Sequence, residues 1–318
     1  MYPGAQLSAV YGLMDLFSTA NQILMERVSQ QAKPLQISSW QSASESMAVE
    51  QLDESGTNSI HRSEQLAVVI IPPNLNSQGS DKPDDATLTW LRQQHEGGAV
   101  LCSICTSAFI LARTGLLDGR PATTHWALKD TFSTQFPQIQ LRIDQIVVED
   151  GDIITAGGVT AWIDLGLRLI DRFLGPSIML AVAQFFLVDP NGREQRFYSK
   201  FAPRLYHGDD AILAVQHRLQ THCSQAISVT DMATVAVLGQ RTFLRRFQKA
   251  TGMKPIAYLQ ALRVGKAKEL LESSQLSFNE ITWTVGYEDQ GAFRRVFQRL
   301  IGLTPSEYRR RFAVYKNE

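Results

Sequence analysis

The chain is poor in cysteine, contains no long apolar run and carries no net charge. It has three cysteines among 318 residues, an odd number that does not suit a disulfide framework. No stretch approaches the roughly 18 consecutive apolar residues of a membrane helix, and Met1 is not followed by a signal-peptide pattern. These absences exclude a disulfide-stapled secreted domain and a membrane protein, and they predict a cytoplasmic protein with no membrane partner.

The formal net charge of zero conceals an uneven distribution. From Ala211 to the C-terminus there are 16 Lys and Arg against 8 Asp and Glu, so the first 210 residues hold 15 against 23. Such asymmetry predicts that the basic part binds a polyanion, whereas the acidic part has another role. An ordinary solvated charged surface is the alternative, which the clustering of arginines within a repeat disfavours.

The first two hundred residues alternate between predicted strands and helices. The predicted strands are Leu35–Trp40, Leu66–Ile71, Ala99–Ile104, Gln145–Val148 and Ile153–Ala156. The predicted helices are a first one through Leu13–Leu24, then Asp84–His95, Cys105–Arg113, Thr160–Phe173 and Pro176–Val188. Buried strands alternating with helices are typical of an open, mainly parallel, doubly wound sheet. The length of 318 residues leaves room for about one further domain.

Any chemistry in this half is expected at Cys105, where a strand runs directly into a helix. Such an elbow lifts the side chain to the carboxyl edge of the sheet, and the helix N-terminus can lower the pKa of a thiol. His125 could then serve as a base or an orienting group. The alternative is that Cys105 is a small buried hydrophobe and His125 a hydrogen-bonded pocket residue. Cys102 and Cys105 form a C-x-x-C without a second Cys pair or a nearby His pair, so no metal site is predicted. A redox pair is disfavoured because Cys102 falls inside the strand, and no cofactor is predicted.

The last third of the chain contains the same unit twice, fifty residues apart. Ten residues recur at that single offset, far more than unrelated segments would share. They are Thr234, Val235, Gln240, Phe243, Arg245, Phe247, Gln248, Gly252, Pro255 and Tyr258.

Each copy predicts a short helix, a tight turn and a second helix. In the first copy Ser228 or Thr230 is the N-cap of a helix over Ser228–Ala236, and Leu238-Gly239 form the turn before a helix over Gln240–Ala250. The second copy predicts helices over Ser277–Val285 and Gln290–Ile301.

The second helix of each copy carries aromatic and basic residues on opposite faces. Phe243 and Phe247 lie four residues apart and should be buried, so that Arg241 and Arg245 face outward and can enter a major groove. A helix of some eighteen residues from Pro255 spans about 27 Å, near the ~34 Å between successive major grooves on one side of DNA. A helical hairpin with merely solvated arginines is the alternative, and the repetition argues against it.

The segment from about Ala211 to Phe312 is similar to the DNA-binding domain of the AraC/XylS family. The similarity rests on Arg245-Arg246-Phe247 through Pro255, Gly286-Tyr287-Glu288-Asp289, Gly302 through Pro305, and Tyr308-Arg309. It implies double-stranded promoter DNA and RNA polymerase as partners and a homodimer as the active form. The residues then expected to contact bases or phosphates, or to flank them, are Gln240, Arg241, Thr242, Arg245, Arg246, Gln290, Arg294 and Arg295. Thr282-Trp283 stands where the family usually has Ile-Ala, which predicts altered packing of that helix.

The first 190 residues resemble the PfpI-like branch of the class I glutamine amidotransferase fold, in the form that serves AraC-type regulators as an N-terminal sensor. The resemblance rests on Tyr2-Pro3-Gly4, Ile104-Cys105-Thr106, Gly115–Arg120 and Ala122–Trp126. It implies a flavodoxin-like α/β domain that binds a small-molecule effector, such as an amino acid or another nitrogenous compound. Open α/β sheets bind such molecules beyond the strand carboxyl ends. The expected wall residues are Cys105, Thr106, His125 and Trp126.

Several departures from enzymes of this fold argue against catalysis. Ala9 stands where those enzymes place a carboxylate, and Pro72-Pro73 replace a turn whose N–H groups form an oxyanion hole. Ser107 stands where glycine is common. No catalytic residue is therefore predicted. The resemblance also implies a central strand just before Tyr2, which predicts either a start further upstream or a sheet without that strand.

Together these patterns predict three segments: an α/β sensor domain over 1–190, a linker over 191–210, and an all-helical domain with two helix-turn-helix motifs over 211–318. The predicted protein is a transcriptional regulator, an activator, whose sensor domain binds a metabolite. The first alternative is a thiol hydrolase or glyoxalase-like enzyme that uses Cys105 and is tethered to DNA. The second is a DNA architectural protein that needs no ligand.

Overall fold

The computed structural model describes residues 2–27, 34–43, 48–52, 65–76, 83–190 and 194–314. The chain forms two compact units, Met1–Gln195 and Arg196–Glu318, so the division falls inside the segment predicted as a linker. We call them the N-terminal unit and the C-terminal unit. None of the helices in the described ranges is long and apolar enough to cross a bilayer.

The N-terminal unit is built on a four-stranded sheet of order β3-β4-β8-β7. Its strands are β3 (Val68–Ile71), β4 (Val100–Ile104), β7 (Val147–Asp150) and β8 (Ile153–Ala156). β3, β4 and β8 run parallel, and β7 is antiparallel to β8, which confirms the predicted mainly parallel sheet. Separate two-stranded pairings join β1 (Ser39–Ala43) to β2 (Ala48–Leu52) and β5 (Pro121–Ala122) to β6 (Gln140–Leu141).

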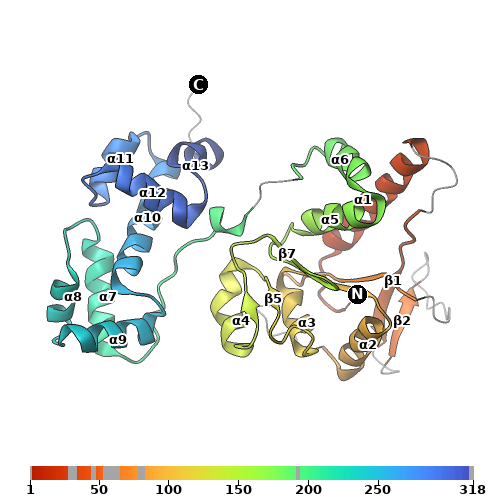
Figure 1. The fold of residues 1–318 in the computed structure, drawn as a ribbon, viewed down its shortest axis with the longest axis horizontal. Helices are drawn as coiled ribbons and strands as arrows, with labels where there is room; N and C mark the ends of the chain where they lie inside the picture. Colours follow the sequence, from red (N-terminus) through yellow and green to blue (C-terminus); the bar gives the residue numbers. More distant parts are fainter. Residues whose placement is uncertain are drawn as a thin grey trace. The chain divides into compact units, whose positions relative to one another are not determined.

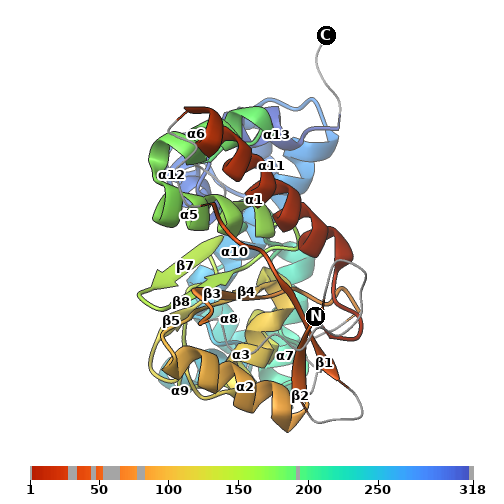
Figure 2. The ribbon, with the colours of Figure 1, turned by 90° about the vertical axis from the view of Figure 1, so that its right-hand side faces the viewer.

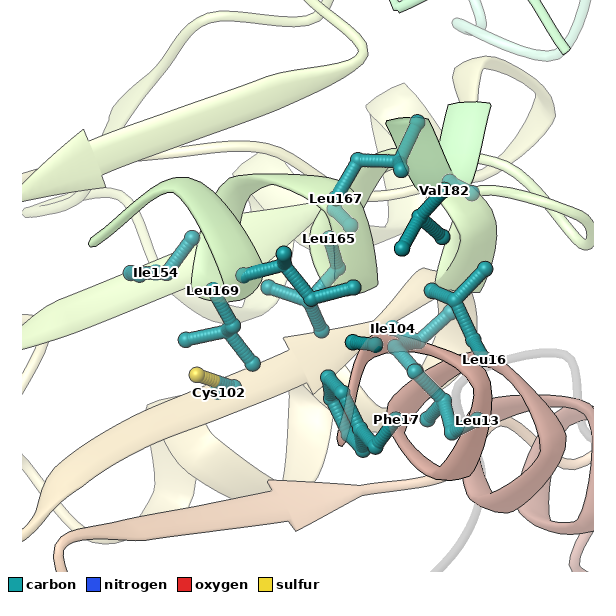
Figure 3. Close-up of a cluster of buried hydrophobic side chains, with 14 of the residues drawn as sticks. Leu13, Leu16, Phe17, Cys102, Ile104, Ile154, Leu165, Leu167, Leu169 and Val182 are labelled. Atoms are coloured by element: carbon teal, nitrogen blue, oxygen red, sulfur yellow. The ribbon is translucent and has the colours of Figure 1, made fainter. Parts of the chain in front are cut away.

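Helices cover both faces of this sheet (Figures 1 and 2). One layer holds α1 (Leu7–Arg27), α5 (Trp162–Leu174) and α6 (Pro176–Phe185), and the opposite layer holds α2 (Asp85–Glu96), α3 (Ala108–Arg113) and α4 (Lys129–Gln135). Because side chains alternate along a strand, Cys102 and Ile104 pack toward α1, α5 and α6 (Figure 3), whereas Leu101 packs toward the other layer. The domain is therefore the predicted doubly wound, flavodoxin-like fold.

The pairing of β3 is relevant to the additional strand that the resemblance implies just before Tyr2. Among the described residues β3 pairs only with β4, and the β1–β2 hairpin forms a sheet of its own. The start of α1 is held beside the end of β3, because the Tyr2 hydroxyl donates to Pro72 O at 2.8 Å and Gln6 N donates to Pro73 O at 2.7 Å. The expectation of a further strand stays a prediction.

The C-terminal unit consists of two small helical cores joined by one long helix (Figure 1). The first core is formed by α7 (Asp210–His222), α8 (Val229–Val235) and α9 (Gln240–Thr251), and the second by α11 (Phe278–Thr284), α12 (Gln290–Ile301) and α13 (Pro305–Phe312). The connecting helix α10 (Pro255–Ser273) contributes to both. Phe243, Phe247, Phe293 and Phe297 are all fully buried, which confirms the predicted aromatic faces.

The two copies are not related by a single offset. Ser228 caps α8 and Ser277 caps α11, each through a capping box, so the first helices are 49 residues apart. The second helices begin at Gln240 and Gln290, 50 residues apart. The turn of the second motif is therefore one residue longer. The recurrence of Thr234 and Val235 at offset fifty is consequently fortuitous, because these residues occupy different places in their helices.

Trp283 does not disturb α11. Its side chain is 58% exposed, whereas the adjacent Ile281 and Thr282 are fully buried and form the packed face. The predicted change in packing is therefore wrong, since the tryptophan lies on the outer face of the helix.

The turn of the second motif requires glycine at position 286, and this generates a stability prediction. Gly286 has φ of +85°, and a Cβ there would lie 2.1 Å from Ser224 O. We expect Gly286→Ala to lower the unfolding free energy of the C-terminal unit by about 2–4 kcal/mol. Gly265→Ala is the matched control: nothing lies within 4 Å of its added Cβ, so it should be neutral or stabilising by up to about 1 kcal/mol. Thermal and urea unfolding measure both, and equal effects would contradict the assignment.

Candidate DNA interface and sensor site

The outer face of α9 borders a hollow of about 740 Å³. Burial of Phe243 and Phe247 turns the polar residues of the helix outward, and Gly252 ends it in the left-handed conformation at φ of +74°. Residues lining the hollow are Gln240, Arg241, Leu244, Arg245, Gln248, Lys254 and Pro255. Three of the predicted DNA-contact residues thus lie together, and Thr242 is exposed on the same helix. Gln248 and Lys254 were not among the predicted contacts, although the recurrence of Gln248 as Gln298 marked it in the sequence.

The outer face of α12 carries the second basic cluster. Arg294 and Arg295 are exposed and Gln290 is half-buried at the first position of the helix. The guanidinium of Arg294 lies 5.7 Å from the centre of the Phe278 ring, which restrains the side chain over an aromatic face. Asp289 caps the helix by accepting from Gly291 N at 2.7 Å. Two of the three predicted residues of the second copy are therefore exposed on the helix, and Gln290 is half-buried at its start.

Arg246 differs from the other predicted DNA-contact residues. Its Nε and Nη2 donate to Oδ2 and Oδ1 of Asp209 at 2.9 and 2.7 Å. Asp209 also caps α7 by accepting from Ile212 N, so the pair ties α9 to the start of α7. In the second copy the corresponding residue is Val296, which packs against the second core. This apolar counterpart was the sequence signal that the position faces inward.

In the N-terminal unit, Cys105 lies at the predicted elbow after β4. It has φ of +58°, a left-handed conformation that is uncommon for a residue with a side chain, and it is 3% exposed. Burial raises the pKa of its thiol to about 11, and a hydrogen bond to the Thr106 backbone lowers it by less. Desolvation thus outweighs any lowering of the thiol pKa by the helix N-terminus, and the burial fits the alternative that Cys105 is a small buried hydrophobe.

The residues after Cys105 use their hydroxyl groups to hold the elbow. Thr106 Oγ1 accepts from Asn74 N at 2.9 Å and donates to Asn74 O at 3.1 Å. Ser107 Oγ accepts from Ile104 N and donates to Ile71 O, both at 2.7 Å. Ser107 thus ties β4 to β3 at a position where glycine could make no such bond. Both hydroxyls are occupied by backbone partners.

The strand end that precedes His125 lies directly beside the elbow. Thr124 Oγ1 donates to Cys105 O at 2.8 Å, so the two halves of the predicted ligand site are brought together. The rings of His125 and Trp126 lie 5.4 Å apart. Burial lowers the pKa of His125, and its Nδ1 accepts from Ala127 N at 3.2 Å. In the described part of the chain no hydrogen bond joins the Cys105 and His125 side chains.

Neither Ala9 nor Cys102 supplies Cys105 with a catalytic partner. Ala9, at the position of the expected carboxylate, is fully buried. Cys102 is also fully buried, and its pKa is raised by the same desolvation. Within the described residues no three His, Cys, Asp or Glu side chains gather as metal ligands do. The elbow at Cys105 is therefore buried and apolar, and the polar segment that precedes His125 lies beside it.

The buried thiol generates a reactivity prediction. With a pKa of about 11, Cys105 is almost wholly protonated near neutrality, so iodoacetamide should modify it at least about a hundredfold more slowly than an ordinary free thiol. The rate should rise as the pH approaches 11, where the thiolate forms. Peptide mass spectrometry in a Cys223→Ala variant measures this, with the denatured protein as control. Rapid modification of Cys105 near neutral pH would contradict the assignment.

The Arg246–Asp209 pair generates a second prediction, because Arg246 lowers the pKa of Asp209. A carboxyl with a lowered pKa contributes stability above its unfolded-state pKa, and this contribution is lost as the pH falls through the folded-state pKa. Arg246→Ala should therefore lower the melting temperature of the C-terminal unit by several degrees at neutral pH. The difference from wild type should shrink below about pH 4. An unchanged melting temperature would mean that the pair does not hold α7 to α9.

Comparisons with known proteins agree with this architecture. A model described as "Helix-turn-helix domain" matches residues 232–311, and one described as "DJ-1/PfpI family" matches residues 41–172. The HTH-type transcriptional regulator CdhR of Pseudomonas aeruginosa is 30% identical over 227 residues, which cover 70% of this chain and 67% of CdhR. The regulator GlxA of Rhizobium meliloti is 31% identical over 229 residues, covering 71% of this chain and 70% of GlxA.

An enzyme is also among the relatives of this chain. Isonitrile hydratase of Pseudomonas putida is 36% identical over 107 residues, which cover 34% of this chain and 46% of the hydratase. The longer matches nevertheless span both units and lead to regulators. The chain belongs to the family of AraC-type helix-turn-helix regulators that carry a DJ-1/PfpI domain, and it is a DNA-binding transcriptional regulator.

Proposed function

We propose that α9 and α12 are the two recognition helices and that each enters the major groove of promoter DNA. The observation that carries this proposal is the exposure of the basic face on both helices, with the aromatic face fully buried. Bidentate Arg and Gln side chains suit guanine and adenine edges, whereas Lys suits phosphates. The proposed contacts are Gln240, Arg241, Thr242, Arg245, Gln248, Lys254, Gln290, Arg294 and Arg295. Arg246 acts indirectly by holding α9 against α7.

Removing one arginine from each helix tests the interface. We expect Arg245→Ala and Arg295→Ala each to weaken specific binding by about 1–3 kcal/mol, or roughly 5- to 150-fold. Lys266→Ala removes the same charge from an exposed site on α10 and should change affinity little. Mobility shifts with the DNA upstream of the gene, across about 50–200 mM salt, separate base contacts from phosphate contacts by the salt slope. Equal losses in all three variants would indicate a non-specific charge effect.

We propose further that the N-terminal unit binds a small metabolite where β4 and the Thr123–Trp126 segment end. Cys105, Thr106, His125 and Trp126 are the proposed wall residues, and the Thr124–Cys105 hydrogen bond supports their proximity. Thr106 contributes a hydroxyl that already serves Asn74, so its role is to shape the wall. A neutral His125 and the adjacent Trp126 ring suit a nitrogenous ligand through a hydrogen bond and an aromatic face.

The effector proposal includes control of transcription. Differential affinity of the metabolite for two states of the protein would change promoter occupancy or activation. A homodimer that contacts RNA polymerase is the proposed active form. Thermal shift with single amino acids, betaines and related nitrogenous compounds tests ligand binding, and transcription in vitro with and without the stabilising compound tests activation. A protein that activates fully and is stabilised by none of them would favour the architectural alternative.

The main rival is catalysis at Cys105, which the similarity to isonitrile hydratase favours. Against it stand the protonated thiol, the alanine at position 9 and the prolines at 72 and 73, which offer no N–H groups to an oxyanion. Cys105→Ala separates the two functions. We expect the variant to bind promoter DNA as tightly as wild type, and we expect wild type to show no thiol-dependent turnover of isonitriles, amides or glyoxals. Turnover that is lost in Cys105→Ala would establish the enzyme.

A further inference from the structure

The side chain of Gln195 is inserted into the N-terminal unit. It is 2% exposed, and its Nε2 donates to Thr123 Oγ1, Thr124 O and Gln145 O at 3.0, 2.9 and 3.0 Å. Its Oε1 accepts from Trp126 N at 2.9 Å. The carboxamide therefore satisfies both its donor and its acceptor capacity within one small site, which we call the amide site.

The amide site is shaped for this one side chain. A Cβ on Gly157 would lie 1.9 Å from Gln195 Nε2, so the glycine leaves the room that the carboxamide fills. The backbone of Gln195 is held as well, because its N–H donates to Asp144 O at 3.0 Å. A carboxylate of the same shape would face three oxygen acceptors, and an apolar side chain would leave Trp126 N without a partner.

The residues directly after Gln195 are anchored in the C-terminal unit. Phe197 is 4% exposed, and the buried Lys268 of α10 donates to Phe197 O and Ser199 O at 3.3 and 2.6 Å. The guanidinium of Arg311 on α13 lies 5.4 Å from the Phe197 ring centre and 5.8 Å from that of Tyr198.

The two anchors lie close together along the chain. Gln195 and Phe197 belong to a single 3-10 turn, η3 (Gln195–Phe197). Only Arg196 stands between Gln195, which fills the amide site, and Phe197, whose carbonyl accepts from Lys268.

We propose that Gln195 transmits the state of the sensor site to the second helix-turn-helix. The pathway begins at the elbow, where Cys105 O accepts from Thr124 Oγ1 and Thr124 O accepts from the Gln195 carboxamide. It continues through the 3-10 turn to Lys268, in the helix that joins the two DNA-binding cores. A ligand that shifts the Thr123–Trp126 segment changes how often the Gln195 carboxamide occupies the amide site. This in turn changes how firmly the Phe197–Ser199 segment is held. This inference rests on the proposed ligand site for its biological input.

Coupling between two sites is reciprocal, which allows a test without ligand or DNA. Hydrogen exchange of the full-length protein is measured for two variants that release opposite ends of the connection. Lys268→Met loosens the C-terminal anchor and should raise exchange of the Trp126 N–H, whose partner is Gln195 Oε1, by about tenfold. Gln195→Ala empties the amide site and should raise exchange by a similar factor in the peptide Gly302–Phe312.

Matched controls separate transmission from general loosening. Gln184→Ala and Lys266→Met make the same chemical changes at exposed positions and should leave both readouts unchanged. Exchange that rises only in the unit carrying the substitution would overturn the proposal, because a purely structural role predicts that result. If Gln195→Ala fails to fold, exchange of the Trp126 N–H in Lys268→Met is sufficient to test the proposal. Neither measurement uses ligand or DNA. A negative result would therefore contradict transmission through Gln195 without contradicting the proposed ligand site or DNA interface, which have separate tests.

Discussion

The DNA-binding unit depends on the burial of two phenylalanines four residues apart in each recognition helix. With 3.6 residues per turn, Phe243 and Phe247 share one face, and their burial leaves only the opposite face for arginine and glutamine. Phe293 and Phe297 repeat the same arrangement in α12. Tyr258 and Tyr308 then close the two cores, packing edge-on against Phe247 and Phe297. The residues that fill the core thus decide which residues of these helices face the solvent.

In the N-terminal unit, burial of the Cys105 thiol opposes the reactivity that the elbow geometry suggests. A strand that enters a helix at Cys105 presents a side chain in a strained conformation, as nucleophilic elbows do. Here, however, the thiol is desolvated and the neighbouring hydroxyls of Thr106 and Ser107 bind backbone groups of β3 and β4 or the residues after them. The hydroxyls of the two residues after Cys105 are thus engaged in holding the elbow. These bonds are consistent with the proposed role of Cys105 as a wall residue of a ligand site.

Much of this architecture follows from local patterns that the sequence displays. Apolar runs at Leu66–Ile71 and Ala99–Ile104 predicted β3 and β4, and the paired phenylalanines predicted the exposed face of each recognition helix. The features that escaped prediction depend on contacts between distant residues. Val296 in the second copy signals that the position of Arg246 faces inward, but the Asp209 partner does not follow from the sequence. Gln195 resembles a polar linker residue, and its burial against Thr123 and Trp126 is visible only in the structure. The longer second turn was hidden because two chance identities matched the wrong register.

The hydrogen bonds of the Gln195 side chain contribute a free energy of a size that suits regulation. A net hydrogen bond contributes about 0.5–1.5 kcal/mol to stability. The carboxamide shares its two N–H groups among three acceptors and accepts one bond, so its bonds are together of the same order as the 1–3 kcal/mol by which allosteric sites usually couple. A much stronger connection, such as a large hydrophobic interface, would hold one state against any small ligand. A flexible linker would transmit nothing. A buried amide with a small number of partners lies between these limits, because a ligand that disturbs the Thr123–Trp126 segment can shift its occupancy at an ordinary binding energy.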